Sequence, residues 1–156
     1  MSFMITGLPV DEFRPLFGLP EQDLAARGVF RHIATTPIGF PCRVTLEDAA
    51  IGQTLLLLNY EHQAADTPYR SRHAIYVSEA ATQTRRAVNE IPGCLSARPH
   101  ISLRAFDCAG MMTAAEIAPG AGLTLAIERM LADPQVSYIH AHNAGRGCFA
   151  ARIDRN

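Results

Sequence analysis

Two strand-like segments flank a glycine-rich turn near the C-terminus, and this pair restricts the possible folds more than any other feature of the sequence. The first segment, residues 138–143, reads Tyr-Ile-His-Ala-His-Asn, and the second, residues 148–153, reads Cys-Phe-Ala-Ala-Arg-Ile. Gly145, Arg146 and Gly147 are suited to a three-residue loop with Gly147 in the left-handed backbone conformation. The sequence therefore predicts a β-hairpin and, with it, an antiparallel sheet.

The two segments also indicate which side chains share a face of that sheet. Side chains alternate along a strand, so the apolar residues of both segments must lie together, and a slip of one residue would expose them. This places five polar or reactive side chains on the opposite face: Tyr138, His140, His142, Cys148 and Arg152.

The exact pairing of the two segments depends on the length of the loop. The three-residue loop pairs His142 with Ala150 and His140 with Arg152, whereas a loop shifted by one residue pairs His142 with Cys148. Both alternatives make Cys148 a neighbour of His142.

Other segments favour the same kind of fold. Thr54–Glu61 is the most apolar run and is typical of a central strand buried on both faces, and residues 73–78 are expected to pair with it as an antiparallel neighbour. Residues 100–106 alternate between apolar and polar side chains, and residues 121–132 have apolar residues at helical spacing. Shorter strands are expected at 3–6, 29–34, 42–46 and 111–118, and a helix at 19–28.

These elements predict an α+β protein. Strands joined by short turns, with helices at intervals, are typical of a mainly antiparallel or mixed sheet with one helix packed on a face. The chain of 156 residues is long enough for one core, and we find no linker or repeat, so we expect a single domain spanning 1–156.

Composition excludes several classes of function. The formal net charge of −1 gives no basic surface for nucleic acid or an anionic membrane, and the longest apolar run is far shorter than the about 20 residues that span a bilayer. The N-terminus lacks the basic and apolar regions of a signal peptide, so we expect a cytoplasmic protein. The four cysteines show no metal-binding or disulfide spacing and are interpreted as free thiols.

Three hypotheses explain the polar face of the hairpin. In the first, His140 or His142 activates Cys148 as a nucleophile. In the second, the His-x-His strand binds a metal through His140, His142 and a third ligand, with His62 as the first choice and Glu61 or His73 as alternatives. In the third, the histidines only satisfy hydrogen bonds in a structural or interaction domain.

Further polar candidates come from other strands. Glu61 and His62 lie at the end of the apolar run, where the strand meets a loop, and functional residues often lie at such positions. Arg104 lies on the polar face of the strand at 100–106, and with Arg152 and Tyr138 it completes the set of candidate ligand-binding residues. No glycine-rich phosphate loop or other specific catalytic motif is present.

Four segments, Phe40–Asp48, Leu55–His62, Ser102–Asp107 and Tyr138–Asn143, resemble an uncharacterised bacterial family catalogued as domain of unknown function 1203. The resemblance extends over nearly the full chain. It implies a small bacterial single-domain protein, and it implies no activity, cofactor or catalytic residue.

The leading hypothesis from the sequence is a pocket over the sheet that binds, or acts on, a small anionic ligand. Arginine would hold the anion, and histidine and cysteine would bind it or react with it. The metal-binding module and the structural domain are the alternatives. Whether the protein is an enzyme, its cofactor and its oligomeric state are left open.

Overall fold

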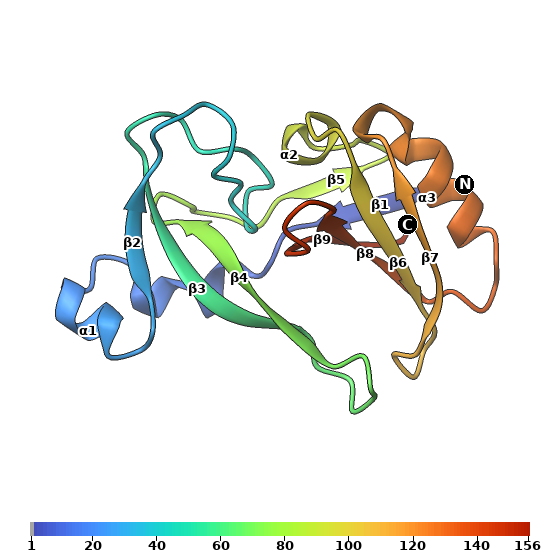
Figure 1. Ribbon diagram of the computed structural model, residues 1–156, viewed down its shortest axis with the longest axis horizontal. Coiled ribbons are helices and arrows are strands. Elements are labelled where there is room, and N and C mark those ends of the chain that lie inside the picture. Colours follow the sequence, from blue (N-terminus) through green and yellow to red (C-terminus); the bar gives the residue numbers. More distant parts are fainter. Residues whose placement is uncertain (1) are drawn as a thin grey trace.

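The computed structural model describes residues 2–156 and contains two antiparallel sheets (Figure 1). The larger sheet has six strands in the order β5-β1-β9-β8-β6-β7, and the smaller has three in the order β2-β3-β4. Every pairing between named strands is antiparallel. An α+β fold with mainly antiparallel sheets is therefore confirmed.

The strands account for most of the regular structure. Those of the larger sheet are β1 (Phe3–Thr6), β5 (Arg86–Val88), β6 (Ile101–Phe106), β7 (Met112–Ala118), β8 (Tyr138–Asn143) and β9 (Phe149–Arg155). Those of the smaller sheet are β2 (Phe30–Ile33), β3 (Thr54–Gln63) and β4 (Ser71–Ser78).

The helices are short. They are α1 (Glu21–Ala25), α2 (Gly93–Ser96) and α3 (Leu123–Leu131), with 3-10 turns η1 (Val10–Glu12), η2 (Arg14–Leu16) and η3 (Gly120–Gly122). Within the described chain, no helix is long and apolar enough to cross a membrane.

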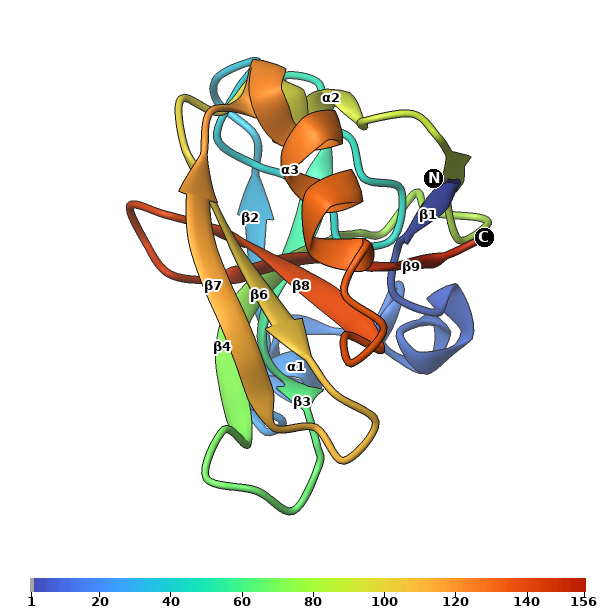
Figure 2. The ribbon, with the colours of Figure 1, turned by 90° about the vertical axis from the view of Figure 1, so that its right-hand side faces the viewer.

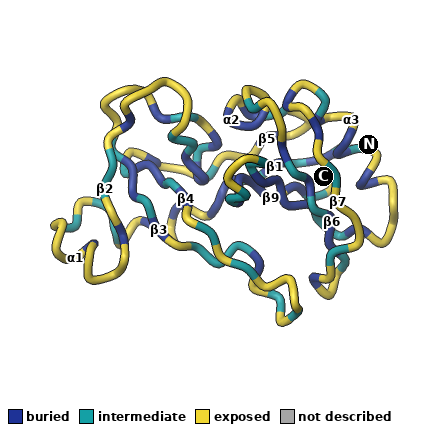
Figure 3. Tube along the Cα trace, viewed as in Figure 1, coloured by how far each residue is buried: buried dark blue, intermediate teal, exposed yellow. Residues whose placement is uncertain are grey.

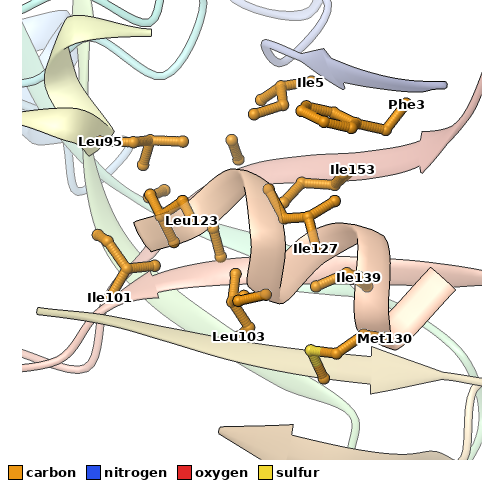
Figure 4. Packing of buried hydrophobic residues seen from close by; sticks show 14 of the residues in the cluster. Phe3, Ile5, Leu95, Ile101, Leu103, Leu123, Ile127, Met130, Ile139 and Ile153 are labelled. Carbon is orange, nitrogen blue, oxygen red and sulfur yellow. The ribbon is translucent and has the colours of Figure 1, made fainter. Parts of the chain in front are cut away.

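Helix α3 covers one face of the larger sheet (Figure 2). Its apolar positions fall on one side at helical spacing, and Leu123, Ile127 and Leu131 are fully buried. They pack against the aliphatic side chains of the sheet, among them Ile139 and Ile153 (Figure 4). The prediction of one helix on a sheet face is confirmed.

A second core lies between the smaller sheet and the N-terminal segment. Leu56, Leu58 and Ile75 pack there with buried residues of η1, α1 and their flanks. Phe149 of β9 belongs to the same cluster, so this core reaches across to the larger sheet. Both sheets accordingly contain buried residues, and most of the loops around them are exposed (Figure 3).

Two expectations about the strands need correction. We expected a single sheet, but β2, β3 and β4 form a sheet of their own. Residues 42–46 form no strand; Cys42 makes one isolated bridge to Tyr76, and the backbone then turns, with Leu46 at a positive φ of 57°. Periodicity describes the faces of a strand and says nothing about which strands become neighbours.

The C-terminal hairpin forms, but its register changes near the turn. His140 pairs with Arg152 and Ala141 with Ala151, as the three-residue loop requires, but His142 pairs with Phe149 and leaves Ala150 as an extra residue. The predicted partners of His142, Ala150 or Cys148, are therefore wrong. The backbone of Asn143 bonds to that of Cys148, so the loop has four residues and a β-bulge absorbs the difference. Gly147 has the predicted left-handed conformation, with φ of 74°.

Candidate functional site

The bulge in β9 changes which side chains face the histidines. Ala151 and Ile153 pack in the core beneath α3, as predicted. Phe149, however, lies on the histidine side, with its ring centroid 5.1 Å from that of His140 and 5.9 Å from that of His142. The expectation that Phe149 joins the aliphatic face is wrong because one inserted residue reverses the alternation beyond it.

A second bulge lies in β3, on the facing sheet. The pairing of β3 with β4 shifts between Glu61 and Gln63, so His62 is the unpaired residue. Both His62 and Gln63 consequently reach β8: the His62 ring contacts His142, and the Gln63 side chain bonds to the hydroxyl of Tyr138. Bulges often redirect side chains beside functional sites.

The two bulged strands bring four imidazoles together between the sheets. The His62 ring centroid lies 4.8 Å from that of His73, 5.0 Å from that of His142 and 5.5 Å from that of His140. His73 comes from β4, and its ring centroid lies 5.4 Å from that of His142. Four of the six histidines in the chain thus form one cluster.

Three of these histidines converge more closely than the fourth. One ring nitrogen each from His62, His73 and His142 lies within 4.8 Å of the others. We call these three residues the histidine trio. A set of three imidazole nitrogens at this separation can hold a metal ion after a small contraction, because tetrahedral zinc lies about 2.0–2.1 Å from each ligating nitrogen.

The orientation of His142 is fixed by the turn of the hairpin. Its Nδ1 lies 2.9 Å from the carbonyl oxygen of Gly147. A carbonyl only accepts, so the neutral ring carries its proton on Nδ1 and an unprotonated lone pair on Nε2. Nε2 is buried and has no hydrogen-bond partner among residues 2–156. A histidine bonded to the backbone through one nitrogen, with the other free, is arranged like a metal ligand.

The other two members of the trio contact each other. His62 Nε2 lies 2.8 Å from His73 Nδ1 and 3.3 Å from the hydroxyl of Ser71. His62 Nδ1 is buried and has no hydrogen-bond partner in the described part of the chain. Buried polar atoms of this kind are uncommon and call for an explanation, such as an ion or a ligand.

Burial keeps the imidazoles neutral. Desolvation lowers the pKa of His62 to about 4, and repulsion from His73 and Arg104 adds to the effect. Desolvation likewise lowers the pKa of His142 to about 3, against the bond to Gly147, which raises it. The pKa of His73 is lowered for the same first reason. The three rings are therefore neutral at neutral pH, which is the form that binds metals.

His140 lies deeper, among aromatic rings. Its centroid is 5.1 Å from those of Phe106, Tyr138 and Phe149. Desolvation lowers its pKa to about 2, and its Nδ1 has no hydrogen-bond partner within residues 2–156. The metal-binding hypothesis from the sequence used His140, His142 and His62; in the structure His73 takes the place of His140 in the converging trio.

Arg104 is the cation next to the cluster. It pairs with His140 across β6 and β8, and its charge lowers the pKa of all four clustered histidines. Among the described residues it has no ion pair with a carboxylate. A metal ion in the trio would share this positive field, which favours an anion as its additional ligand.

Two of the predicted ligand-binding residues have their partners elsewhere. The Arg152 guanidinium lies 4.0 Å from the centre of the Tyr138 ring and forms an ion pair of 2.8 Å with Asp154. The Tyr138 hydroxyl accepts a hydrogen bond from Gln63 Nε2 at 2.8 Å. Tyr138 still contacts the cluster, because its ring centroid lies 5.1 Å from that of His140.

Glu61 lies outside the cluster. Its carboxylate forms an ion pair of 2.9 Å with Arg70, and this hydrogen bond lowers its pKa. The Glu61 carboxylate is therefore paired with Arg70 near the end of β3, one residue before the bulge, and is not part of the histidine cluster.

Cys148 belongs to a different group from the histidines. Its sulfur accepts hydrogen bonds from Arg43 Nη2 at 3.2 Å and from Asn143 Nδ2 at 3.3 Å. The structure thus replaces the predicted cysteine–histidine pair with a cysteine–arginine pair.

A cavity of about 660 Å³ lies beside the trio, between β4, the loop at 39–43 and the turn of the hairpin. His73 lines it and also belongs to the trio. Cys148 and Arg43 line it as well. The trio therefore borders a cavity large enough for a small molecule.

Sequence reasoning did not place three residues that build this region. Arg43 was a candidate for an anion site or for balancing an acid but was not expected near the histidines, Phe149 was expected on the opposite face, and His73 was only an alternative third ligand. Bulges carry no clear sequence signal, so Phe149 could not be placed. His73 could have been found, because antiparallel pairing of its strand with the apolar run brings it close to His62.

Fold and site together define a small α+β protein with two antiparallel sheets and a partly buried histidine cluster between them. The chain belongs to the family described as "Protein of unknown function (DUF1203)", whose model matches residues 39–155. The match spans both bulged strands and the trio. No curated protein and no solved structure matches the chain.

Proposed function

We propose that the protein binds a transition-metal ion at His62, His73 and His142. The main support is His142, which supplies one of the three converging ring nitrogens, and whose Nδ1 is held by the Gly147 carbonyl while Nε2 is buried and without a partner in the described chain. A structural role alone leaves this nitrogen unsatisfied, at a cost of about 1–3 kcal/mol.

The ligand set favours particular metals. Three neutral imidazoles suit zinc, copper, iron or nickel rather than magnesium or calcium, which prefer oxygen ligands. Zinc is the first choice, since three protein ligands with one open position is the arrangement of its reactive sites. An ion held this way would lower the pKa of a bound water or polarise a substrate oxygen.

The experiment is a metal-binding titration with matched variants. Chelator-treated protein is dialysed against zinc or cobalt, and the bound metal is counted by elemental analysis. The wild-type chain should take up one ion. His73→Ala and His142→Ala should each lower the affinity by about a hundredfold or more, because loss of a group that only supports a ligand already costs about 10–100-fold.

His32→Ala is the control. His32 is a histidine of β2 that contacts Tyr76, so its replacement removes an imidazole outside the cluster. Equal metal uptake by the wild type and both trio variants, or no uptake by a folded wild type, would reject the proposal.

A cytoplasmic location in a bacterium forms part of the proposal. The four cysteines are free thiols, which agrees with a reducing compartment.

A further inference from the structure

The cavity beside the trio has a positively charged, largely apolar lining. Three arginines line it, Arg43, Arg98 and Arg146, and its lining includes neither aspartate nor glutamate. Arg98 is neutralised by Asp48, with which it forms a partly buried ion pair of 2.7 Å. Arg146, in the hairpin turn, is exposed and has no ion pair among residues 2–156. The cavity therefore has a net positive charge.

Arg43 is the unusual member of this set. Only 3% of it is exposed, yet its three hydrogen bonds go to the carbonyls of Phe149 and Pro41 and to the sulfur of Cys148. No carboxylate of the described chain pairs with it. Burial of a charge without a counter-charge is costly, and arginine stays protonated in proteins.

Arg43 also has donors to spare. A guanidinium has five N–H groups, and three are used in the bonds to Phe149, Pro41 and Cys148. The remaining two belong to a side chain that lines the cavity. A ligand with an anionic oxygen would satisfy these donors and supply the missing counter-charge.

The rest of the wall is suited to an apolar body. Leu57, Tyr76 and Ala74 form the side contributed by the smaller sheet, and Pro41 and Pro99 face the same space. Largely apolar walls with a few polar groups at one place are typical of small-molecule sites.

We propose that this cavity binds a small carboxylate with an apolar body, its carboxylate held by Arg43 and Arg146 and its body by Leu57 and Tyr76. The site shares His73 with the trio, but none of the contacts proposed for the carboxylate involves a metal ion. In this proposal the ligand binds beside β4 and the hairpin turn, away from Arg152 and Tyr138.

The test uses two probes of nearly equal shape, phenylacetate and phenylacetamide, titrated into chelator-treated protein by calorimetry or by NMR. Phenylacetate should bind about tenfold tighter or more, because hydrogen bonds to charged groups contribute more than those to neutral ones. Inorganic phosphate serves as a third probe, an anion without an apolar body, and should bind more weakly than phenylacetate.

Two variants locate the site without disturbing the core. Arg146→Gln, at an exposed position, should weaken phenylacetate binding by about threefold or more. Ala74→Trp fills the cavity from an exposed position of β4 and should weaken it by about tenfold or more. Arg70→Gln removes an arginine paired with Glu61 outside the cavity and should leave binding unchanged.

Several outcomes would overturn the inference: phenylacetamide binding as tightly as phenylacetate, phosphate binding more tightly than phenylacetate, or Ala74→Trp binding phenylacetate like the wild type. Failure of phenylacetate to bind the folded protein would do the same. Because the protein is free of metal in this titration, none of these results decides whether the trio binds zinc.

Discussion

The two faces of β8 are built from opposite chemistry. On one face Ile139 and Ala141 are fully buried against α3, and on the other His140 and His142 are just as deeply buried against the smaller sheet. The aliphatic face has no polar group to satisfy. The imidazole face leaves ring nitrogens of both histidines, and one of His62, without a partner in the described chain.

This difference separates the part of β8 that stabilises the fold from the part that costs stability. Burial of aliphatic side chains is favourable, whereas each buried nitrogen without a partner is unfavourable by about 1–3 kcal/mol. Buried nitrogens with this free-energy cost are expected at a site where a bound ligand satisfies them. We therefore expect substitutions on the two faces of β8 to have different effects on stability and on zinc binding.

The largest effect is expected on the aliphatic face. Ile139→Ala removes a fully buried side chain beneath α3 and should lower the free energy of unfolding by about 2–5 kcal/mol, measured by denaturant titration. Zinc affinity should be unchanged in the folded variant. A loss of zinc binding as severe as that of His142→Ala would show that the two faces are not separate in function.

Zinc should stabilise the imidazole face. At a free concentration a hundredfold above its Kd, an ion that binds only the folded state stabilises it by about 2.7 kcal/mol. The midpoint temperature of thermal unfolding should therefore rise when zinc is added and return to its original value when a chelator is added. In His142→Ala zinc should change it little. An equal shift in His142→Ala and wild type would place the ion elsewhere.

Acid should destabilise the metal-free protein through the same face. Below pH 6.5 unfolded histidines take up protons, whereas folded His140 and His142, with pKa values of about 2 and 3, stay neutral. The unfolded state then binds more protons, so stability falls as pH falls. Together the two residues should cost about 2 kcal/mol per pH unit between pH 6 and 5.

Denaturant titrations at several pH values measure this slope. The double variant His140→Phe with His142→Leu should reduce it to the part contributed by the remaining groups. An unchanged slope in that variant would contradict the assignment.

The smallest effect is expected at His140. His140→Phe replaces an imidazole that lies among aromatic rings and outside the trio, and it removes a buried nitrogen without a partner. Stability should change by about 1 kcal/mol or less, with either sign, and zinc affinity should remain within about threefold. A large loss of zinc affinity would include His140 in the metal site.

Much of the fold could be predicted from the sequence, because it depends on local patterns. The alternation at 138–143 corresponds to β8, the apolar run at 54–61 lies within β3, and the helical spacing at 121–132 covers the end of η3 and all of α3. The requirement that Ile139 and Ile153 face the core fixed only the parity of the hairpin register, and the pairing of His140 with Arg152 is the one that the three-residue loop predicted.

The composition of the site could not be predicted to the same extent. It depends on two bulges, one at His62 and one at Ala150, and on the contact between two sheets. Each bulge inserts one residue, which reverses the alternation from which faces are deduced. The contact of Arg43 with Cys148 joins residues more than a hundred positions apart and follows from tertiary packing alone.

Anomalous diffraction at the zinc edge, from crystals soaked in zinc, would show which residues bind the ion. We expect one ion bonded to a single nitrogen each of His62, His73 and His142, at about 2.0–2.1 Å. Anomalous density that is absent from the trio, or an ion held by His140 in place of His73, would contradict this expectation.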